Sequence, residues 1–343
     1  MLNRFAAVLA FSVAASAVCV NDTLRVQSYN LRNDAIPNSI SVATTISGLN
    51  DTVPADSEMS YYSLYAEQPW STRRLSVVAQ VMFHQPVVLC VQEAKVRQVQ
   101  DLAGMLDGYE YIGVGRDDGK TAGEYSAIFY KSSALNLVSE KYLWLSETPY
   151  EPSKYLGAGS TRIVTIGRFT TAASGNTVTA MCTHWDDKSE DAREYAASMI
   201  RYAGAYEAAN SSGPVLLFGD FNSHSSGTDT GGYEIVTGVS DMLTMNSTFT
   251  SDYASDLSDS FVFEDLLLAT PPLYRSGHHA TFTGFYEAGD SDAFGRIDFI
   301  MGGNNGGWDA LTYRVEENFF DGEYHASDHR PVLSDVVVSS CGA

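Results

Sequence analysis

The chain has 343 residues, of which 44% are hydrophobic and 12% aromatic, so it can bury a sizeable core in one large or two ordinary domains. Forty-two acidic residues against 21 Lys and Arg give a formal net charge of −21. A surface of that sign repels polyanions at long range, which disfavours a protein that coats DNA or RNA. The charge is still compatible with an enzyme that holds divalent cations and binds nucleic acid transiently.

The first residues have the pattern of a secretory signal peptide. Arg4 precedes an apolar run over residues 5–13, and Ala15-Ser16-Ala17 offers small residues for cleavage. We therefore expect residues 1–17 to be removed and the remaining residues, 18–343, to be secreted. The apolar run is too short to span a membrane, and no later stretch approaches the required length. A secreted eukaryotic chain can also be glycosylated, and the sequence holds four Asn-x-Ser/Thr sequons, at Asn21, Asn50, Asn210 and Asn246.

The four cysteines show no close pair of the kind that binds zinc. Cys19 and Cys341 flank the two ends of the mature chain, and they can meet as a disulfide if the first strand runs antiparallel to the last. Cys90 and Cys182 lie inside apolar strands, where we expect buried free thiols.

Hydrophobic patterning predicts strands and helices that alternate at the start of the chain. Residues 24–30 alternate as a strand does, and residues 87–91 form a continuous apolar run typical of a buried strand. Helical spacing is present at 73–83 and 96–106, so helices are expected outside sheets, in one domain with two packed sheets. Further strands are predicted at 125–131, 135–145, 162–170, 178–183, 215–218, 296–301 and 331–338, a long helix at 189–209, and irregular segments at 34–70 and 223–279.

Strand after strand in this pattern ends on a polar or charged side chain. Asp220 and Asn222, which follow the apolar strand 215–218, lie two apart and would leave an extended backbone on one face. Asp, Asn and Gly are common in turns, so a turn explains one such strand end as well as a functional site does. Six such strand ends along the chain are harder to explain by turns alone. If they converge, they form an oxygen-rich pocket that suits Mg²⁺ or Mn²⁺. The side chains concerned are Asn30, Glu93, His184, Asp220, Asn222, Asp298, Asp328 and His329.

Six short motifs, taken together and in this order, resemble the endonuclease/exonuclease/phosphatase superfamily, which has the DNase I-like fold. The resemblance covers residues 24–338 and implies an α/β (α+β) fold, a four-layer α/β/β/α sandwich of two packed mixed sheets with outer helices. Segments 113–120 and 144–149 are similar to a branch of secreted or uncharacterised members. The motifs are Ser28-Tyr29-Asn30, Val91-Gln92-Glu93, Thr183-His184-Trp185-Asp186, Gly219-Asp220-Phe221-Asn222, Arg296-Ile297-Asp298 and Ser327-Asp328-His329.

The resemblance implies hydrolysis of a phosphoester with the help of Mg²⁺ or Mn²⁺. Glu93 matches the principal metal carboxylate, with Asn30 beside it, and Asp328 matches a further metal or water contact. Two residues after Asn30, many nucleolytic relatives carry Asp, whereas this chain has Arg32. That departure implies either a one-metal site or an extra cation against the substrate.

The resemblance also assigns catalytic roles. Asp220 and Asn222 match the pair that orients the attacking water and the phosphate. His329 matches the histidine that faces the scissile phosphate, and Asp298 the carboxylate that fixes its tautomer. His184 matches a second histidine of the DNase-like members.

Two further residues are expected to contact the substrate or its histidines. Arg162 stands where such enzymes place a phosphate-binding arginine, whose planar fork suits two phosphate oxygens. Glu124 is a candidate carboxylate partner for His184. For both residues the alternative is a surface ion pair.

Three functions remain open from the sequence, and the resemblance to the family favours the first. The first is a secreted phosphodiesterase of nuclease type, an exonuclease or endonuclease on DNA or RNA, acting as a monomer without an obligate protein partner. The second is the same chemistry on a small or lipid-linked phosphoester, such as an inositol phosphate or a phosphorylated glycan. The third is a non-catalytic binding protein on the same scaffold, which is disfavoured because every matched catalytic position is retained.

Overall fold

The computed structural model describes residues 20–49, 52, 55, 57, 66–286, 294–320 and 324–339. The predicted signal peptide, the predicted Cys19–Cys341 disulfide and the sequon at Asn50 lie outside these residues. Within the described part of the chain, no helix is long and apolar enough to cross a membrane.

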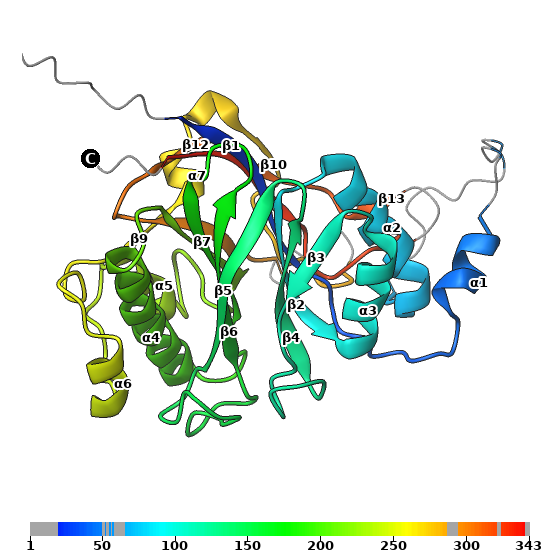
Figure 1. Cartoon of the computed structure of the whole chain (residues 1–343). Helices are drawn as coiled ribbons and strands as arrows, with labels where there is room; N and C mark the ends of the chain where they lie inside the picture. Colours follow the sequence, from blue (N-terminus) through cyan, green and yellow to red (C-terminus); the bar gives the residue numbers. More distant parts are fainter. Residues whose placement is uncertain are drawn as a thin grey trace, which may run out of the picture.

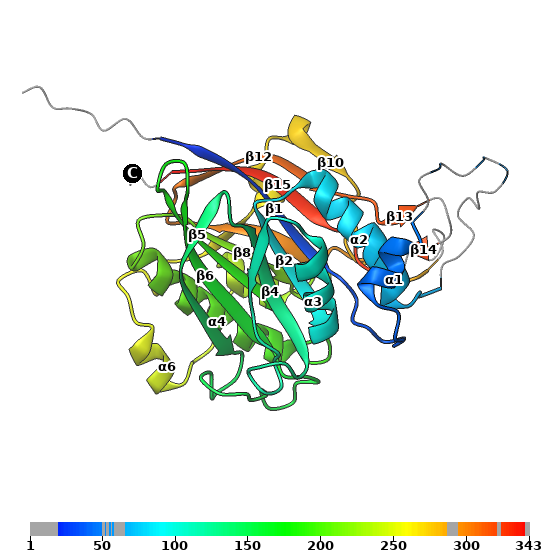
Figure 2. The ribbon, with the colours of Figure 1, turned by 45° about the vertical axis from the view of Figure 1, so that its right-hand side comes forward.

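Two mixed sheets pack face to face, and helices cover their outer faces (Figures 1 and 2). The larger sheet holds, in spatial order, β10 (Arg275–Gly277), β12 (Trp308–Val315), β15 (Val332–Val338), β1 (Asp22–Asn30), β2 (Val88–Lys95), β4 (Glu124–Lys131) and β3 (Tyr109–Ile112). The smaller sheet holds β5 (Leu135–Trp144), β6 (Ile163–Thr171), β7 (Thr177–His184), β8 (Val215–Asp220), β11 (Asp298–Gly303) and β9 (Phe263–Asp265). A separate small ribbon pairs β13 (Phe319–Phe320) with β14 (Tyr324–His325).

The helices lie in two groups outside the sheets. Helices α2 (Trp70–His84) and α3 (Val96–Met105) pack on the larger sheet, and α4 (Glu190–Ala209) and α5 (Gly231–Thr237) pack on the smaller one (Figure 1). Short helical segments complete the chain: α1 (Val42–Ser47), α6 (Ser247–Asp252), α7 (Leu266–Ala269) and η2 (Pro272–Tyr274).

Three apolar layers separate the four structural layers. Val26 of β1 and Phe218 of β8 belong to the layer between the sheets, whereas Leu89 of β2 packs outward against Val81 of α2. Ile200 of α4 belongs to the third layer, against the smaller sheet. Because alternate residues of one strand enter different layers, most strands are buried on both faces. The predicted four-layer sandwich is confirmed.

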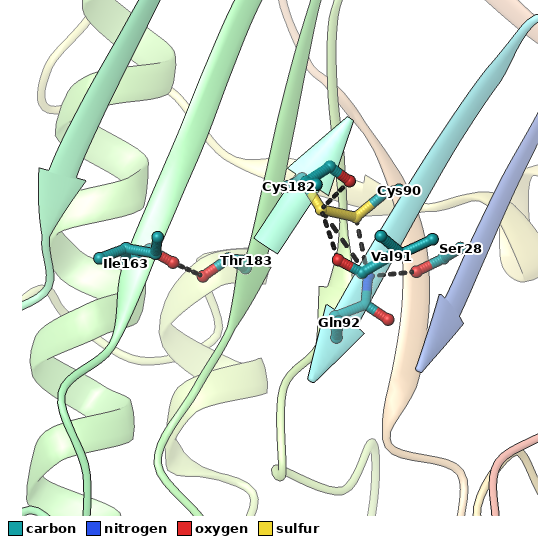
Figure 3. Close-up of a disulfide and its surroundings, with 8 residues drawn as sticks. Ser28, Cys90, Val91, Gln92, Ile163, Cys182 and Thr183 are labelled. Carbon is teal, nitrogen blue, oxygen red and sulfur yellow. Dashed lines mark hydrogen bonds between the residues drawn. A yellow bond between two sulfur atoms is a disulfide. The ribbon is translucent and has the colours of Figure 1, made fainter. Parts of the chain in front are cut away.

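One prediction about the cysteines is wrong. Cys90 of β2 and Cys182 of β7 are not free thiols but form a disulfide that joins the two sheets through the inner layer (Figure 3). Their Cα atoms are 5.6 Å apart, within the range that a disulfide spans. The two strands face each other, but 92 residues separate the cysteines in sequence, and strand patterning does not tell which strands face one another.

Other elements differ from expectation in instructive ways. The first strand runs antiparallel to the last, with Asp22 opposite Val338, which is the condition stated for a disulfide between Cys19 and Cys341. The segment 34–70, expected to be irregular, contains α1, and the segment 223–279 contains several short helices and two short strands. Strand β12 was not predicted. It exposes or half-exposes most of its residues, so its sequence lacks a strong apolar pattern.

Candidate active site

The polar strand ends meet at one edge of the two sheets. Strand β1 is parallel to β2, and β7 is parallel to β8, so within each pair the carboxyl ends lie at the same edge. His184 and Asp220 are direct partners in the β7–β8 register. Asn30, at the end of β1, reaches the other sheet, because its Nδ2 donates to Asp220 Oδ2 at 2.9 Å. The two sheets therefore contribute to one polar site.

The backbone departs from ordinary strand geometry at three of these positions. Arg32, Glu93 and Asn222 have φ values of +53°, +61° and +46°, a region that residues other than glycine rarely adopt. Glu93 lies in an irregularity of the β2–β4 register between Val91 and Ala94. Bulges of this kind re-aim a side chain, and they are common beside active sites. The local backbone thus aims these three side chains into the site.

Glu93 is held through both carboxylate oxygens. Oε1 accepts from Asn30 Nδ2 at 3.1 Å, and Oε2 accepts from the backbone N–H of Asn33 at 3.1 Å. Asn30 therefore bridges Glu93 and Asp220 with one amide group, while its Oδ1 accepts from the backbone N–H of Arg32 at 3.0 Å. In this arrangement Asn30 orients the carboxylates, and the predicted role as a metal ligand requires its amide to turn.

His329 lies between two buried acids. Its Nδ1 donates to Asp298 Oδ2 at 2.9 Å, and its Nε2 lies 3.6 Å from Asp220 Oδ2. Burial lowers the pKa of His329, but the neighbouring Asp298 and Asp220 raise it well above its ordinary value. Burial, with Asp298 nearby, raises the pKa of Asp220 to about 7. The arrangement pairs a protonated imidazole with a carboxyl group that titrates near neutral pH.

His184 has different surroundings. Its Nε2 is 3.0 Å from Asn222 Nδ2 and 3.5 Å from Asp220 Oδ2, while Glu124, its expected partner, lies 4.0 Å from Nδ1. Among the described residues, Nδ1 has no hydrogen-bond partner. Burial and the positive charges of Arg162 and Arg116 lower the pKa of His184 well below its ordinary value. His184 is thus a neutral imidazole, in contrast to His329.

Two arginines stand beside His184, and only one of them was expected. Arg162 is buried rather than on the surface, with its Nη2 donating to Asp187 Oδ1 at 2.8 Å. Arg116, which sequence reasoning missed as a site residue, lies 2.6 Å from Glu124 through its Nη1. Arg116 lies in the glycine-rich segment 113–120, which the sequence analysis used only as a resemblance to a branch of the family. The position of Arg116 in that segment was the one feature of the sequence that could have indicated it.

Asp328 and Arg32 lie at the rim of the site. Asp328 Oδ2 is 3.9 Å from Arg32 Nε, and Glu93 Oε2 is 4.0 Å from Arg32 Nη1. Burial raises the pKa of Asp328, and the charge of Glu93 adds to the shift. The residues predicted to bind metal, act in catalysis or contact substrate therefore lie in one region. Within it, Glu124 is paired with Arg116 and Arg162 with Asp187.

The donor set fits a divalent cation. Ligand atoms of Glu93, His184 and Asp220 lie within 4.8 Å of one another, and so do those of Asp220, Asp298 and His329. The carboxylates are buried or nearly so, and the repulsion between Asp220 and Asp298 contributes to the raised pKa of Asp220. Buried carboxylates of this density are stabilised by a cation with oxygen preference.

Comparisons with known proteins agree with this site. The family model described as the endonuclease/exonuclease/phosphatase family matches residues 28–329. A solved structure of that family from Bacteroides vulgatus is 25% identical, with a TM-score of 0.69 over 92% of this chain and 98% of the other. A mannosyl-6-phosphatase from Bacteroides thetaiotaomicron is 27% identical, with a TM-score of 0.66 over 91% of this chain and 99% of the other. No curated protein sequence matches the chain.

Fold, donor set and comparisons together define a metal-dependent hydrolase of phosphoesters. The chain belongs to the endonuclease/exonuclease/phosphatase family, and the resemblance drawn from its six motifs is confirmed.

Proposed function

We propose that the chain hydrolyses a phosphomonoester on a sugar or another small molecule, with Mg²⁺ or Mn²⁺ as its cofactor. The observation that carries the proposal is the pair of arginines, Arg116 and Arg162, beside His184. A terminal phosphate carries about −1.5 to −2 charge at neutral pH, whereas an internal phosphodiester carries a single charge. Glu124 and Asp187 each pair with one of these guanidinium groups, but Arg162 Nη1 has no hydrogen-bond partner among the described residues and can donate to a phosphate oxygen beside a divalent cation.

The likeness to the mannosyl-6-phosphatase supports the same choice. It extends over 91% of this chain at 27% identity, and the activity in its name is removal of a phosphate from a sugar. The overall charge of −21 also disfavours long contacts with a nucleic-acid backbone.

The proposed mechanism assigns tasks to the side chains of the site. Glu93 and Asp220, which Asn30 joins, would hold the cation with Asp328 nearby, and the cation would supply Lewis-acid polarisation of a phosphoryl oxygen. Asp220 is also proposed to orient the attacking water and accept its proton; its pKa of about 7 applies to the chain without a cation, which would lower it. Asn222, 3.0 Å from His184, orients the phosphate.

Protonated His329 is proposed to give its Nε2 proton to the leaving oxygen of the phosphoester as the P–O bond breaks, so that the leaving group departs as an alcohol while Asp220 takes the proton of the attacking water. Asp298 accepts the Nδ1 proton at 2.9 Å, which fixes the orientation and tautomer of the ring. His184, kept neutral beside Arg116 and Arg162, is proposed to hydrogen-bond the phosphate without adding a second imidazolium charge.

A panel of substrates tests the proposal. Purified protein with Mg²⁺ or Mn²⁺ is offered mannose 6-phosphate, an inositol phosphate, p-nitrophenyl phosphate, bis(p-nitrophenyl) phosphate, and DNA and RNA oligonucleotides. We expect kcat/KM for the best monoester to exceed that for every diester at least tenfold. The nuclease activity expected from the sequence is the competing outcome, and cleavage of oligonucleotides with no release of phosphate from monoesters establishes it. No turnover of any substrate at any metal concentration would favour the non-catalytic binding protein.

We also propose that the protein is secreted. A buried disulfide, Cys90–Cys182, is typical of an oxidising compartment, and the sequence begins with the signal-peptide pattern. N-terminal sequencing of protein recovered from the medium tests this, because an intact Met1 contradicts cleavage after residue 17.

A further inference from the structure

Arg32 places a fixed positive charge between two carboxylates of the site. Its Nη1 lies 4.0 Å from Glu93 Oε2, and its Nε lies 3.9 Å from Asp328 Oδ2. Glu67 binds the same guanidinium through two oxygens, at 3.1 Å and 3.3 Å. Three carboxylates therefore surround one guanidinium, whose side chain is 32% exposed.

The backbone prevents Arg32 from leaving this position easily. Its φ of +53° lies in the left-handed region, and its N–H donates to Asn30 Oδ1. Its carbonyl oxygen accepts from Arg73 Nη2 at 3.0 Å and from Gln98 Nε2 at 2.9 Å. Both donors are themselves buried, so the segment that carries Arg32 is anchored to α2 and α3.

The two oxygens of Glu93 consequently face different partners. Oε2 accepts from the backbone and the side chain of Asn33 and faces Arg32. Oε1 faces Asn30, the residue that also contacts Asp220. The guanidinium therefore faces Oε2 of Glu93 and Asp328, whereas Oε1 of Glu93 faces the amide that also contacts Asp220.

The second group of clustered ligand atoms is already engaged. His329 Nδ1 and Asp298 Oδ2 are joined by a 2.9 Å hydrogen bond, which a metal ion on those atoms would have to break. An ion on Asp298 Oδ1 and His329 Nε2 instead would share Asp220, which lies 3.6 Å from Nε2 and is already assigned to the first ion. A second ion between Glu93 and Asp328 would instead meet a guanidinium at close range, where like charges repel strongly.

From this arrangement we propose that the enzyme binds a single catalytic divalent cation, on the Glu93–Asp220 side, and that Arg32 is the fixed cation which replaces a second ion between Glu93 and Asp328. The inference rests on the metal dependence of the family and not on which phosphoester is cleaved. Arg32 is a positioning residue for the metal site: it neutralises the outer carboxylates and sets how many ions the site accepts.

Metal binding is the direct test, measured without turnover. Wild-type protein, freed of metal and then titrated with Mn²⁺ at 0.15 M NaCl, is followed by calorimetry, by metal content after gel filtration and by EPR. We expect one tightly bound Mn²⁺ per chain, with the spectrum of an isolated ion. Glu93→Gln should weaken that ion at least tenfold, which assigns it to this site.

Arg32 variants then test the replacement of a second ion. Arg32→Gln removes the charge and should tighten the first Mn²⁺ about tenfold or more, because the nearby repulsion is lost. Arg32→Asp should bind two Mn²⁺, with EPR signals broadened by coupling between neighbouring ions. Glu67→Gln, which removes a carboxylate bound to Arg32 Nε and Nη2 but keeps the guanidinium, is the matched control and should keep one ion.

Three results overturn the inference: two coupled ions in the wild type, unchanged or weaker Mn²⁺ affinity in Arg32→Gln, or a folded Arg32→Asp that still binds one. Circular dichroism checks folding of each variant, and Arg32→Gln decides if Arg32→Asp does not fold. Because none of these readouts involves a phosphoester, failure of the proposed substrate leaves them unaffected.

Discussion

Removal of the Cys90–Cys182 disulfide is the perturbation whose cost can be worked out most directly. The double variant Cys90→Ala/Cys182→Ala breaks the covalent link between β2 and β7 while leaving both positions apolar. The bond closes a loop of 92 residues in the unfolded chain. In the chain-entropy description, a loop of that length corresponds to about 4.6 kcal/mol of stability at 25 °C.

The same figure translates into a melting temperature. An unfolding entropy of about 2.1 cal/mol/K per residue amounts to roughly 0.7 kcal/mol/K for a chain of this size. The midpoint of thermal unfolding should therefore fall by about 6 °C. Cys90 and Cys182 precede Glu93 and His184 by three and two residues, so we also expect turnover to fall more steeply with temperature in the variant than in the wild type.

Differential scanning calorimetry without reductant measures the shift. The single variant Cys90→Ala, which leaves one unpaired thiol, is the control and should melt within about 2 °C of the double variant, since both lack the cross-link. Thiol titration of the unfolded wild type must show that the two cysteines are oxidised. A double variant that melts within 2 °C of an oxidised wild type would refute the reasoning.

Three further predictions concern the site and its support. His329→Ala should lower kcat by about 10²–10⁴-fold with an unchanged circular dichroism spectrum, and Asp298→Asn should lower it by less; equal activity in steady-state assays would contradict the proposed proton donor. With chelator present, Asp220 binds its proton more tightly in the folded chain, so stability should fall as pH rises from about 4 through 7, by up to about 4 kcal/mol. For Asp220→Asn, the free energy of unfolding in urea should depend less on pH than in the wild type. If the two pH dependences are parallel, the loss of stability does not come from Asp220. Arg73→Met should cost about 3–5 kcal/mol in urea unfolding, because the buried guanidinium donates to the carbonyl oxygens of Leu31, Arg32, Asn33, Gln68 and Ala326; a loss below 1 kcal/mol would show that these carbonyls find other donors.

Strong local patterns account for the part of the fold that the sequence predicted. The apolar run before Asp220 was predicted as a strand and the segment 189–209 as a long helix, and both elements are present. Strand β12 was not predicted, because most of its residues are exposed or half-exposed and it lies next to the edge strand of its sheet. The disulfide depends on which strands face one another, which is a property of the packed sheets rather than of any window of residues.

The site shows the same division. The polar strand ends were visible as a recurring pattern, and the structure brings them together. Arg116 acts through the geometry of its loop and through Glu124, so no local signal marked it beyond the glycines around it. Arg32 was noticed as an unexpected residue, but its contacts with Glu67 and Asp328 depend on segments distant in sequence.

The left-handed backbone at Arg32, Glu93 and Asn222 affects how the site should be dissected by mutagenesis. Alanine in that region of φ/ψ space costs about 1 kcal/mol or more, whereas glycine adopts it freely and asparagine tolerates it. An alanine variant at these positions therefore combines loss of the side chain with a strained backbone. Glycine isolates loss of the side chain more closely, and the difference between the glycine and alanine variants measures how much of each defect comes from the main chain.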